Sequence, residues 1–272
     1  MADMKEAISA IEKEPDIRHI ISVSGGKDSA ALAVYLKESF PQIPAEYVFC
    51  DTGTELPETY EYLDKMEAVL GIEITRVNAL AMMGVKPKPG RNSFDWVLNE
   101  RYGGYLPNPR MRWCTRILKI QPFEHFVGET NCFSYIGIRA DEKREGYVSN
   151  KKSPVLSQRP NVVPVYPLKE AGIVFADVKR ILDESGLGWP EYYEWRSRSG
   201  CFFCFYQQKG EWQQLRKNHP DLYERAKAYE RTEGNKRFTW VDGRTLSELE
   251  QDPKEYPVQT PDEADGCAIC HL

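Results

Sequence analysis

The segment that decides the fold is 19–29, which reads His19-Ile20-Ile21-Ser22-Val23-Ser24-Gly25-Gly26-Lys27-Asp28-Ser29. Residues 19–23 form an apolar run typical of a buried strand, and the apolar spacing over 29–40 predicts a helix. Between them, two glycines allow backbone N–H groups to approach an anion, and the helix N-terminus adds the positive end of its dipole. The segment therefore predicts a phosphate-binding loop, with an ordinary glycine turn as the alternative.

The side chains of this loop suit the same purpose. Lys27 supplies a positive charge, and Ser24 and Ser29 supply hydroxyl donors. The loop is not a Walker A motif, because Asp28 stands where that motif has Ser or Thr and Ile21 stands where it has its first glycine.

Strands and helices alternate through the first two thirds of the chain. Apolar runs at 45–50, 73–77 and 133–138 predict further strands, and 57–70 reads as a helix that Gly71 ends. Strand–helix–strand units of this length imply a parallel sheet with right-handed crossovers. The predicted fold class is α/β, with a doubly wound, Rossmann-like parallel sheet.

The texture of the sequence changes in its last third. Residues 189–206 are dense in aromatic side chains, 209–231 is a long charged helical pattern, and 242–265 is acidic and punctuated by proline. We therefore predict an α/β domain over 1–185 and a smaller, mainly helical, cysteine-rich region over 186–272.

Composition excludes several classes of protein. The 272 residues are 41% hydrophobic and 28% charged, as expected for a globular protein rather than a disordered one. No apolar run approaches the roughly 18 to 20 residues that cross a bilayer, and the N-terminus lacks a secretory signal, so we expect a cytoplasmic protein without a membrane partner. The net charge of -5 means that any contact with nucleic acid requires a local basic patch.

Three segments carry a resemblance to a known family. Segment 24–29 resembles the SGGxDS loop of the ATP pyrophosphatases, the adenine nucleotide alpha hydrolases. Segment 49–59, Phe49-Cys50-Asp51-Thr52-Gly53-Thr54-Glu55-Leu56-Pro57-Glu58-Thr59, resembles a signature of the phosphoadenosine phosphosulfate (PAPS) reductase branch. Segment 137–142 resembles the Gly-x-Arg-x-x-Glu segment of the same branch, and the resemblance as a whole covers about residues 15 to 206.

The resemblance implies a set of site residues. Asp51 would bind Mg²⁺ or the ribose, and Arg139 would close over the phosphates. The expected catalytic residues are Lys27, Asp28, Asp51 and Arg139. The expected ATP contacts are Ser22, Ser24, Gly25, Gly26, Lys27, Asp28, Ser29, Asp51, Thr52, Gly53, Gly137 and Arg139.

The seven cysteines raise the question of a metal. Four of them form two Cys-x-x-Cys pairs, Cys201/Cys204 and Cys267/Cys270. Segment 111–119 resembles the stretch that carries a cysteine pair in iron–sulfur members of the family, although Thr115 replaces the second cysteine. The resemblance implies a [4Fe–4S] cluster on Cys114, Cys201, Cys204 and Cys267, with Cys270 as the alternative fourth ligand.

Two other interpretations of these cysteines stay open. Cys201, Cys204, Cys267 and Cys270 have the spacing of a zinc site, which would leave Cys114 outside. Alternatively, Cys267 or Cys270, close to His271, is a nucleophile like the one that ends the reductases of the family. Cys50 and Cys132 belong to strand segments, and we expect both to be core residues.

A local concentration of positive charge stands out in this acidic chain. It comprises 86–91, with Lys86, Lys88 and Arg91, and then Arg110, Arg112, Arg116 and Lys119. Trp96, Tyr102 and Tyr105 are interleaved with it, a pattern that suits a phosphate backbone with stacked bases, and a solvated charged face is the alternative.

The family resemblance implies the reaction. ATP would be cleaved to AMP and pyrophosphate while an acceptor is adenylated for sulfur incorporation. The departures from the reductase pattern most resemble the subgroup that activates the DNA backbone for phosphorothioation. A cysteine desulfurase would then supply the sulfur, and other subunits of a modification complex would hold DNA.

Three alternative functions remain at this point. The first is a sulfonucleotide (APS or PAPS) reductase, with thioredoxin as reductant. The second is a tRNA thiolation enzyme. The third is a subunit without catalytic activity that senses a nucleotide or a cluster.

Overall fold

The computed structural model describes residues 2–86, 89–142, 157, 159–232 and 237–259. Cys267, Cys270 and His271, which carry three of the predictions above, lie outside these residues. Within them the chain forms a parallel sheet of five strands in the order β3-β2-β1-β4-β5, which confirms the predicted fold class. The strands are β1 (Arg18–Ser22), β2 (Ala45–Cys50), β3 (Ile74–Val77), β4 (Cys132–Tyr135) and β5 (Val162–Val165).

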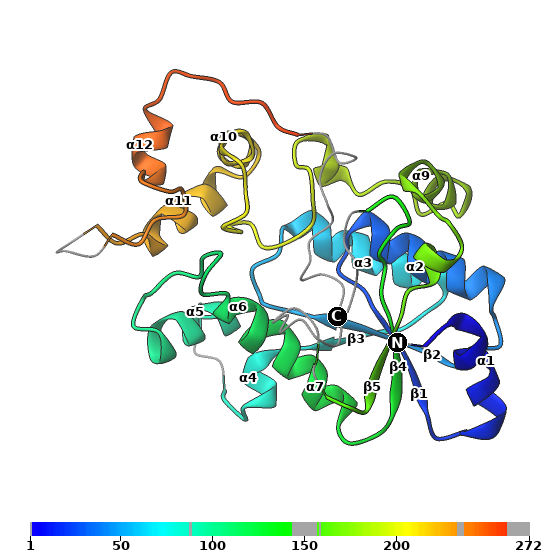
Figure 1. Ribbon diagram of the computed structural model, residues 1–272. Helices are drawn as coiled ribbons and strands as arrows, with labels where there is room; N and C mark the ends of the chain where they lie inside the picture. The colour runs from blue at the N-terminus through cyan, green and yellow to red at the C-terminus, as the bar shows by residue number, and fades with distance from the viewer. Residues whose placement is uncertain (1, 87–88, 143–156, 158, 233–236, 260–272) are drawn as a thin grey trace.

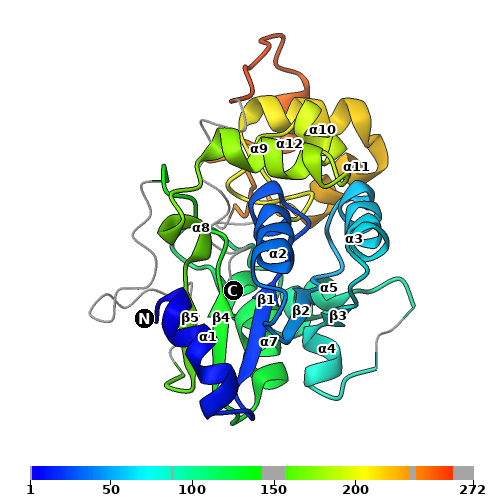
Figure 2. The same ribbon diagram turned by 90° about the vertical axis from the view of Figure 1, so that its right-hand side faces the viewer.

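Helices cover both faces of the sheet (Figures 1 and 2). One face packs against a large apolar cluster contributed by α1 (Met4–Lys13), α2 (Lys27–Ser39), α3 (Pro57–Leu70) and α9 (Phe175–Glu184). The other face carries Ile20 and Val48, which pack against α7 (Gln121–Val127). This two-sided burial explains the apolar runs at the strands, because a parallel strand has no face left for water.

Local signals in the sequence account for most element ends. The predicted strand at 45–50 and the predicted helix at 57–70 match β2 and α3, and Gly71 ends α3 in the left-handed conformation at φ +58°. Helix α2 starts at Lys27, two residues earlier than predicted, because Gly26 has the extended backbone of an N-cap residue.

Two predicted elements were wrong in extent. The pattern over 209–231 forms two helices, α10 (Lys209–Asn218) and α11 (Pro220–Tyr229), because Pro220 has no N–H to continue the first helix and is favoured at the start of the second. Strand β4 ends at Tyr135 rather than Ile138, so the residues after it leave the sheet.

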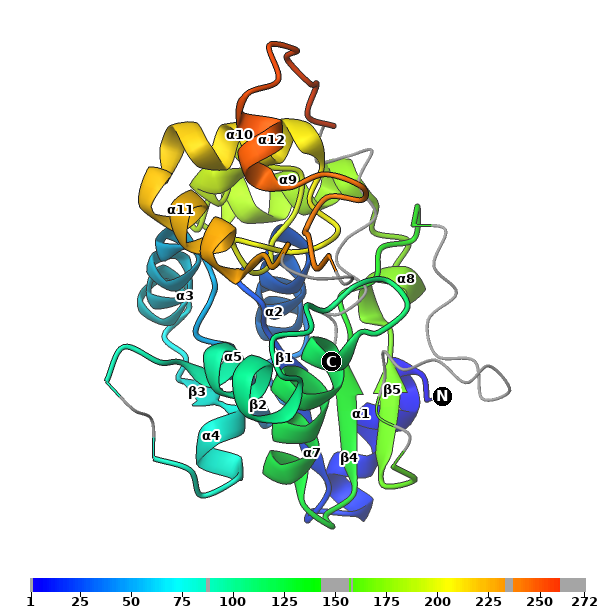
Figure 3. The ribbon, with the colours of Figure 1, turned by 90° about the vertical axis from the view of Figure 1, so that its left-hand side faces the viewer.

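The C-terminal helices lie together beyond one end of the sheet (Figures 1 and 3). They are α10, α11 and α12 (Leu246–Glu250), and they follow a short 3₁₀ turn at Glu191–Glu194. Their aromatic core, which includes Phe203, Trp212 and Trp240, is shared with residues of the middle of the chain, such as Phe94 and Trp113. The boundary at residue 185 stays a prediction.

The middle of the chain contributes short helices to this shared core. They are α4 (Ala79–Met82), α5 (Ser93–Trp96), a π-helical turn at Val97–Arg101, α6 (Trp113–Thr115) and a second π-helical stretch at Arg116–Ile120. Helix α8 (Pro167–Glu170) instead places Leu168 in the apolar cluster that covers the sheet. None of the helices in the described residues is both long enough and apolar enough to cross a membrane.

Candidate functional site

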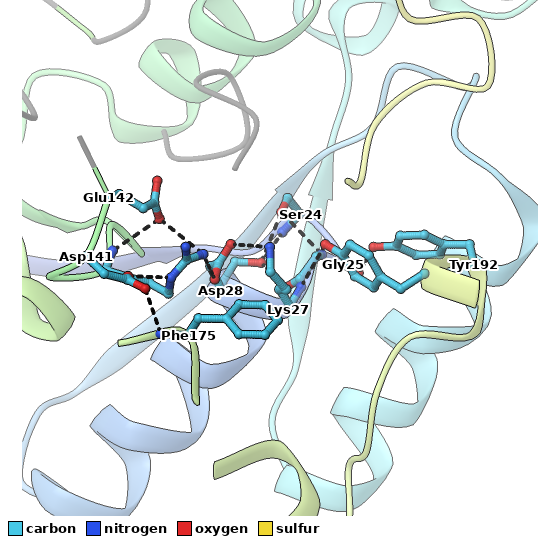
Figure 4. A network of polar contacts seen from close by, with 12 residues as sticks. Ser24, Gly25, Lys27, Asp28, Asp141, Glu142, Phe175 and Tyr192 are labelled. Atoms are coloured by element: carbon cyan, nitrogen blue, oxygen red, sulfur yellow. Dashed lines mark hydrogen bonds and ion pairs between the residues drawn. The ribbon is translucent and has the colours of Figure 1, made fainter. Parts of the chain in front are cut away.

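The loop between β1 and α2 is held closely by its neighbours. Gly25 has φ +69°, and a Cβ atom there would lie 2.7 Å from Cγ2 of Thr59. A Cβ atom on Gly26 would lie 2.6 Å from Oγ of Ser199. The Tyr192 hydroxyl donates to the carbonyl oxygen of Gly25 at 2.7 Å (Figure 4). Both positions therefore require glycine, and the backbone of the loop has a fixed shape.

The hydroxyl groups of the loop are arranged around its turn. The Ser29 hydroxyl donates to the carbonyl oxygen of Gly26 at 3.0 Å and accepts from the backbone N–H of Ser24 at 3.1 Å. In contrast, the Ser22 hydroxyl is buried at the end of β1 and has no hydrogen-bond partner in the described part of the chain. A buried donor without an acceptor is uncommon, and a bound oxyanion would satisfy it.

Two buried cations share one carboxylate beside this loop. The Lys27 ammonium lies 3.0 Å from Oδ2 of Asp28, and Nη1 of Arg139 lies 2.9 Å from Oδ1 of the same residue (Figure 4). Lys27 and Arg139 are only 1% and 3% exposed. The Phe175 ring lies within 6 Å of both cations, at 5.9 Å from the ammonium and 5.4 Å from the guanidinium. Charge is thus concentrated at the phosphate-binding loop with little water around it.

Neighbouring groups keep both cations charged. Burial by itself would lower the pKa of Lys27, but Tyr193 and Asp28 next to the ammonium raise it. Burial likewise opposes the charge of Arg139, and Asp28, Asp141 and Glu142 raise its pKa. These cations stay protonated through the physiological pH range, as a site for polyphosphate requires.

Gly137 brings the Arg139 segment against the loop. A Cβ atom on Gly137 would lie 2.9 Å from the carbonyl oxygen of Asp28, so no larger residue fits without a backbone shift. Asp141 then accepts from Nε of Arg139 at 2.8 Å and from the backbone N–H of Phe175 at 3.1 Å, which ties the arginine to the start of α9. The structure therefore brings Lys27, Asp28 and Arg139 together as predicted.

The segment after β2 builds a tight turn. Oδ1 of Asp51 accepts from the backbone N–H of Gly53 at 2.7 Å and from the Tyr60 hydroxyl at 2.8 Å. The Thr52 hydroxyl contacts the carboxyl group of Glu55, and burial raises the pKa of that carboxyl group. Asp51 therefore shapes the turn, and its contact with a nucleotide or Mg²⁺ stays a prediction.

Three cysteines line one small cavity next to this turn. Cys114, Cys201 and Cys204 surround a space of about 40 Å³ together with Thr52 and Lys119, and we call it the cysteine cavity. Thr52 Oγ1 lies 3.5 Å from the Cys201 sulfur. Burial raises the pKa of Cys114 to about 12 and that of Cys201 to about 11, so both are neutral thiols in the absence of a metal.

The three thiols line one cavity, and the [4Fe–4S] cluster expected on them stays a prediction. No three His, Cys, Asp or Glu side chains of the described residues converge closely enough to hold one metal ion. In a [4Fe–4S] cluster each thiolate binds a different iron, so the cysteines surround the group instead of meeting at a point. The predicted fourth ligand, Cys267 or Cys270, lies outside the described residues, as does half of the predicted zinc site.

The other two cysteines have the environment of core residues. Cys132 is completely buried on β4. The Cys50 thiol donates to the carbonyl oxygen of Lys119 at 3.4 Å. Cys50 also packs against the apolar cluster that contains Cys132. Both agree with the expectation from the sequence.

One loop of the C-terminal region, residues 196–204, touches both parts of the site. Ser199 lies against Gly26 of the phosphate-binding loop. Two residues later, Cys201 forms a β-bridge with Glu55, and the backbone N–H of Phe202 donates to the carbonyl oxygen of Thr54 at 2.8 Å. The loop therefore connects the phosphate-binding loop to the cysteine cavity over a few residues.

Several residues of the site were missed from the sequence. They are Phe175, Tyr192, Tyr193, Ser199 and Glu55, and four of the five come from segments more than 140 residues after the phosphate-binding loop. The aromatic density of 189–206 is the one signal that pointed to Tyr192 and Tyr193, although it does not say what they contact.

Comparisons with known proteins place the chain in a family. A model of the phosphoadenosine phosphosulfate reductase domain matches residues 18–207. An uncharacterized protein of Methanocaldococcus jannaschii, MJ0066, is 26% identical over 212 residues, which are 76% of this chain and 40% of that protein. The chain spans less than half the length of the curated relatives it matches.

Two solved structures are similar at 17% identity. One is the PAPS reductase from Candida auris in its phosphate complex, with a TM-score of 0.46 over 71% of this chain and 84% of that chain. The other is the U34-tRNA thiolase NcsA from Methanococcus maripaludis with its [4Fe–4S] cluster, with a TM-score of 0.39 over 94% of this chain and 90% of that chain. The family model covers most of the chain, from β1 to the loop that carries Cys201 and Cys204, and the chain therefore belongs to the phosphoadenosine phosphosulfate reductase domain family.

Proposed function

We propose that this protein is an ATP pyrophosphatase that adenylates an acceptor for sulfur incorporation. The observation that carries the proposal is the loop 196–204, because it links a phosphate-binding loop with two buried cations beside it to a cavity lined by three thiols. A sulfonucleotide reductase needs no cleavage of ATP, whereas adenylation followed by sulfur transfer uses both halves of such a site.

The phosphate-binding loop would act by positioning and by electrostatics. The β- and γ-phosphates of ATP would lie against the N–H groups of Gly25 and Gly26, with Lys27 and Arg139 neutralising their charge. An acceptor oxygen would attack the α-phosphorus, the bond from that phosphorus to the β-phosphate oxygen would break, and pyrophosphate would leave with the electron pair. Mg²⁺ bound to the phosphates would stabilise the leaving group.

Sulfur transfer would complete the sequence. The outer sulfur of a persulfide, formed by a cysteine desulfurase, would attack the acceptor atom that bears the adenylated oxygen. The bond from that atom to the oxygen would break, and AMP would leave with the oxygen and the bonding electrons. A thiol reductant would cleave the remaining sulfur–sulfur bond. We propose the DNA backbone as the acceptor, in a cytoplasmic modification complex, on the family resemblance of the sequence.

The cysteine cavity would hold the [4Fe–4S] cluster through Cys114, Cys201 and Cys204. When bound, the cluster would supply iron capable of carrying sulfur beside the nucleotide. The last described residue, Gln259, is hydrogen-bonded to Gln208, four residues after Cys204. The eight residues from Gln259 to Cys267 can span up to about 28 Å when extended.

A tRNA acceptor is the second candidate. The observation that favours it is the set of three thiols beside the phosphate-binding loop, since the similar thiolase NcsA carries a [4Fe–4S] cluster and acts on U34 of tRNA. The two candidate functions therefore share the same ATP chemistry and differ in whether the acceptor is DNA or tRNA.

The products formed from ATP test the proposal. Anaerobically purified protein, incubated with ATP, Mg²⁺ and a DNA or tRNA acceptor, should form AMP and pyrophosphate in equal amounts. Lys27→Met should abolish both products, because it removes the buried charge at the loop, whereas Lys37→Met near the other end of α2 should not. Release of sulfite from a sulfonucleotide in the presence of a thiol, without AMP formation from ATP, would show a reductase instead.

A further inference from the structure

An arginine-rich segment before the cysteine cavity has no carboxylate partner among the described residues. Elsewhere in the described chain, arginines such as Arg18 and Arg244 form ion pairs with acidic side chains. Arg110, Arg112 and Arg116 form no ion pair with any described carboxylate, although the protein has a net charge of -5. A cluster of positive charge without acidic partners, in a protein with a net negative charge, indicates that this segment binds an anionic molecule.

A tyrosine gathers two of the cations of this region. The guanidinium carbon of Arg112 lies 5.7 Å from the centre of the Tyr206 ring, and that of Arg198 lies 5.1 Å from it. Tyr206 is 37% exposed, one of the few large hydrophobic side chains with that much exposure among the described residues. Both guanidinium groups lie within cation–π distance of the ring, so Tyr206 joins cations from two segments of the chain.

Arg112 has donors that nothing in the described chain satisfies. Its Nε and Nη2 atoms are buried and without a hydrogen-bond partner. Arg116 lies one helical turn further on, since its backbone N–H donates to the carbonyl oxygen of Arg112, and its side chain is exposed. The exposed guanidinium groups of Arg110 and Arg116 suit the oxygen atoms of phosphate groups.

This region borders the cysteine cavity. Arg112 precedes Cys114 by two residues, and Tyr206 follows Cys204 by two residues. Met111, whose side chain is 47% exposed, adds apolar surface next to Arg112. An acceptor bound here would therefore lie beside the three thiols.

We propose that Arg110, Arg112, Arg116, Arg198 and Tyr206, which we call the arginine–tyrosine surface, bind a single strand of nucleic acid. The arginines contact its phosphates, and Tyr206 offers a ring for a base. The surface has more cations than one free phosphate requires, and they come from two segments of the chain. The role of the bound strand as the sulfur acceptor rests on the proposed function. The binding itself does not, since it is measurable without catalysis.

Two of the three aromatic side chains that the sequence suggested for this role, Tyr102 and Tyr105, are placed elsewhere. Tyr102 stacks on Trp113 with ring centres 4.7 Å apart, and Tyr105 packs edge-on against Phe238 at 4.9 Å. Both belong to the aromatic core that the C-terminal helices share. Arg112 of the basic concentration therefore meets Tyr206, from a distant segment, instead of Tyr102 or Tyr105.

Fluorescence anisotropy with a labelled 20-nucleotide DNA strand tests the inference. For single strands the logarithm of the binding constant falls with the logarithm of salt by about 0.7 per phosphate contact. The double variant Arg110→Gln/Arg116→Gln should therefore lower the slope by about 1.4 and weaken binding about 25-fold at 0.1 M salt. The control Arg76→Gln/Arg180→Gln removes the same charge from two exposed ion pairs, and it should leave the slope unchanged.

Tyr206 separates stacking from charge. Tyr206→Leu should weaken strand binding about tenfold with little change in the salt slope, and Tyr206→Phe should bind like the wild type. Equal affinities and slopes for the wild type and Arg110→Gln/Arg116→Gln would overturn the inference, as would displacement of the strand by inorganic phosphate at the same phosphate concentration. AMP formation without strand binding would overturn this inference and leave the proposed function standing. Strand binding without AMP formation would overturn the proposed function and leave this inference standing.

Discussion

Replacing Asp28 by Asn removes the carboxylate that lies between two buried cations. Arg139 keeps Asp141 at 2.8 Å and Glu142 at 3.6 Å, so the uncompensated charge falls on Lys27, which is 1% exposed. The new amide would also direct N–H donors toward a cation. Breaking a buried ion pair at one partner costs about 3–5 kcal/mol, and we expect Asp28→Asn to lower the free energy of unfolding by that amount.

Urea unfolding and thermal melting measure this loss. For a chain of this size, 3–5 kcal/mol corresponds to a melting temperature about 6–20 °C lower. Asp64→Asn is the matched control, because Asp64 pairs with Arg76 at the surface with its side chain 69% exposed. That variant should lose no more than about 1 kcal/mol, since exposed ion pairs contribute little.

A ligand and a second substitution sharpen the test. Pyrophosphate should stabilise Asp28→Asn more than the wild type, because its charge replaces the missing carboxylate beside Lys27. The double variant Lys27→Met/Asp28→Asn should be more stable than the sum of the two single effects by at least about 1 kcal/mol. If Asp28→Asn unfolds at the same urea concentration as Asp64→Asn, and pyrophosphate stabilises both equally, the account of the buried charges is wrong.

Two further predictions concern the loop and the cysteines. Tyr192→Phe should raise the KM for ATP and lower the free energy of unfolding by about 1–2 kcal/mol, because the Gly25 carbonyl loses its donor. The control Tyr62→Phe removes a hydroxyl that is bonded to another glycine carbonyl at 2.8 Å, and it should lower the free energy of unfolding without changing the KM. Steady-state kinetics and urea unfolding would compare the two variants, and an unchanged KM in Tyr192→Phe would contradict the role of the tyrosine. After anaerobic reconstitution, Cys204→Ser should contain less iron than the wild type, while Cys50→Ser should contain the same amount. Iron analysis and the absorption spectrum measure this. Equal iron content in the two variants would show that Cys204 is not a ligand.

The elements that local signals define could be predicted from the sequence. Strand β2 and helix α3 had the predicted bounds because Pro57 and Gly71 mark the ends of the helix by backbone chemistry that acts within a few residues. The split between α10 and α11 was also encoded locally, at Pro220, but the charged helical pattern on both sides of the proline masked it.

The positions of Lys27, Asp28 and Arg139 could be predicted from the sequence for a similar reason. Lys27 and Asp28 follow the glycines directly, and Arg139 lies just after a strand of the same sheet. Parallel strands end at one edge, so the two segments meet there. The sequence does not show that Asp28 pairs with both cations, because this depends on the side-chain geometry of two segments 111 residues apart.

The groups that close the site depend on tertiary packing. Tyr192 and Ser199 reach the phosphate-binding loop only because the C-terminal helices share an aromatic core with residues such as Phe94 and Trp113. No local pattern encodes that association. The same packing brings Tyr206 to Arg112, while Tyr102 and Tyr105 pack in the aromatic core.

The coupling of ATP cleavage to sulfur transfer tests the central claim most directly. Anaerobically reconstituted protein would be supplied with ATP, a cysteine desulfurase, ³⁵S-labelled cysteine, a thiol reductant and a DNA strand. We expect AMP, pyrophosphate and ³⁵S bound to the strand in equal amounts, with all three lost in Lys27→Met. Sulfur incorporation that continues without ATP, or ATP cleaved to ADP and phosphate, would contradict the claim.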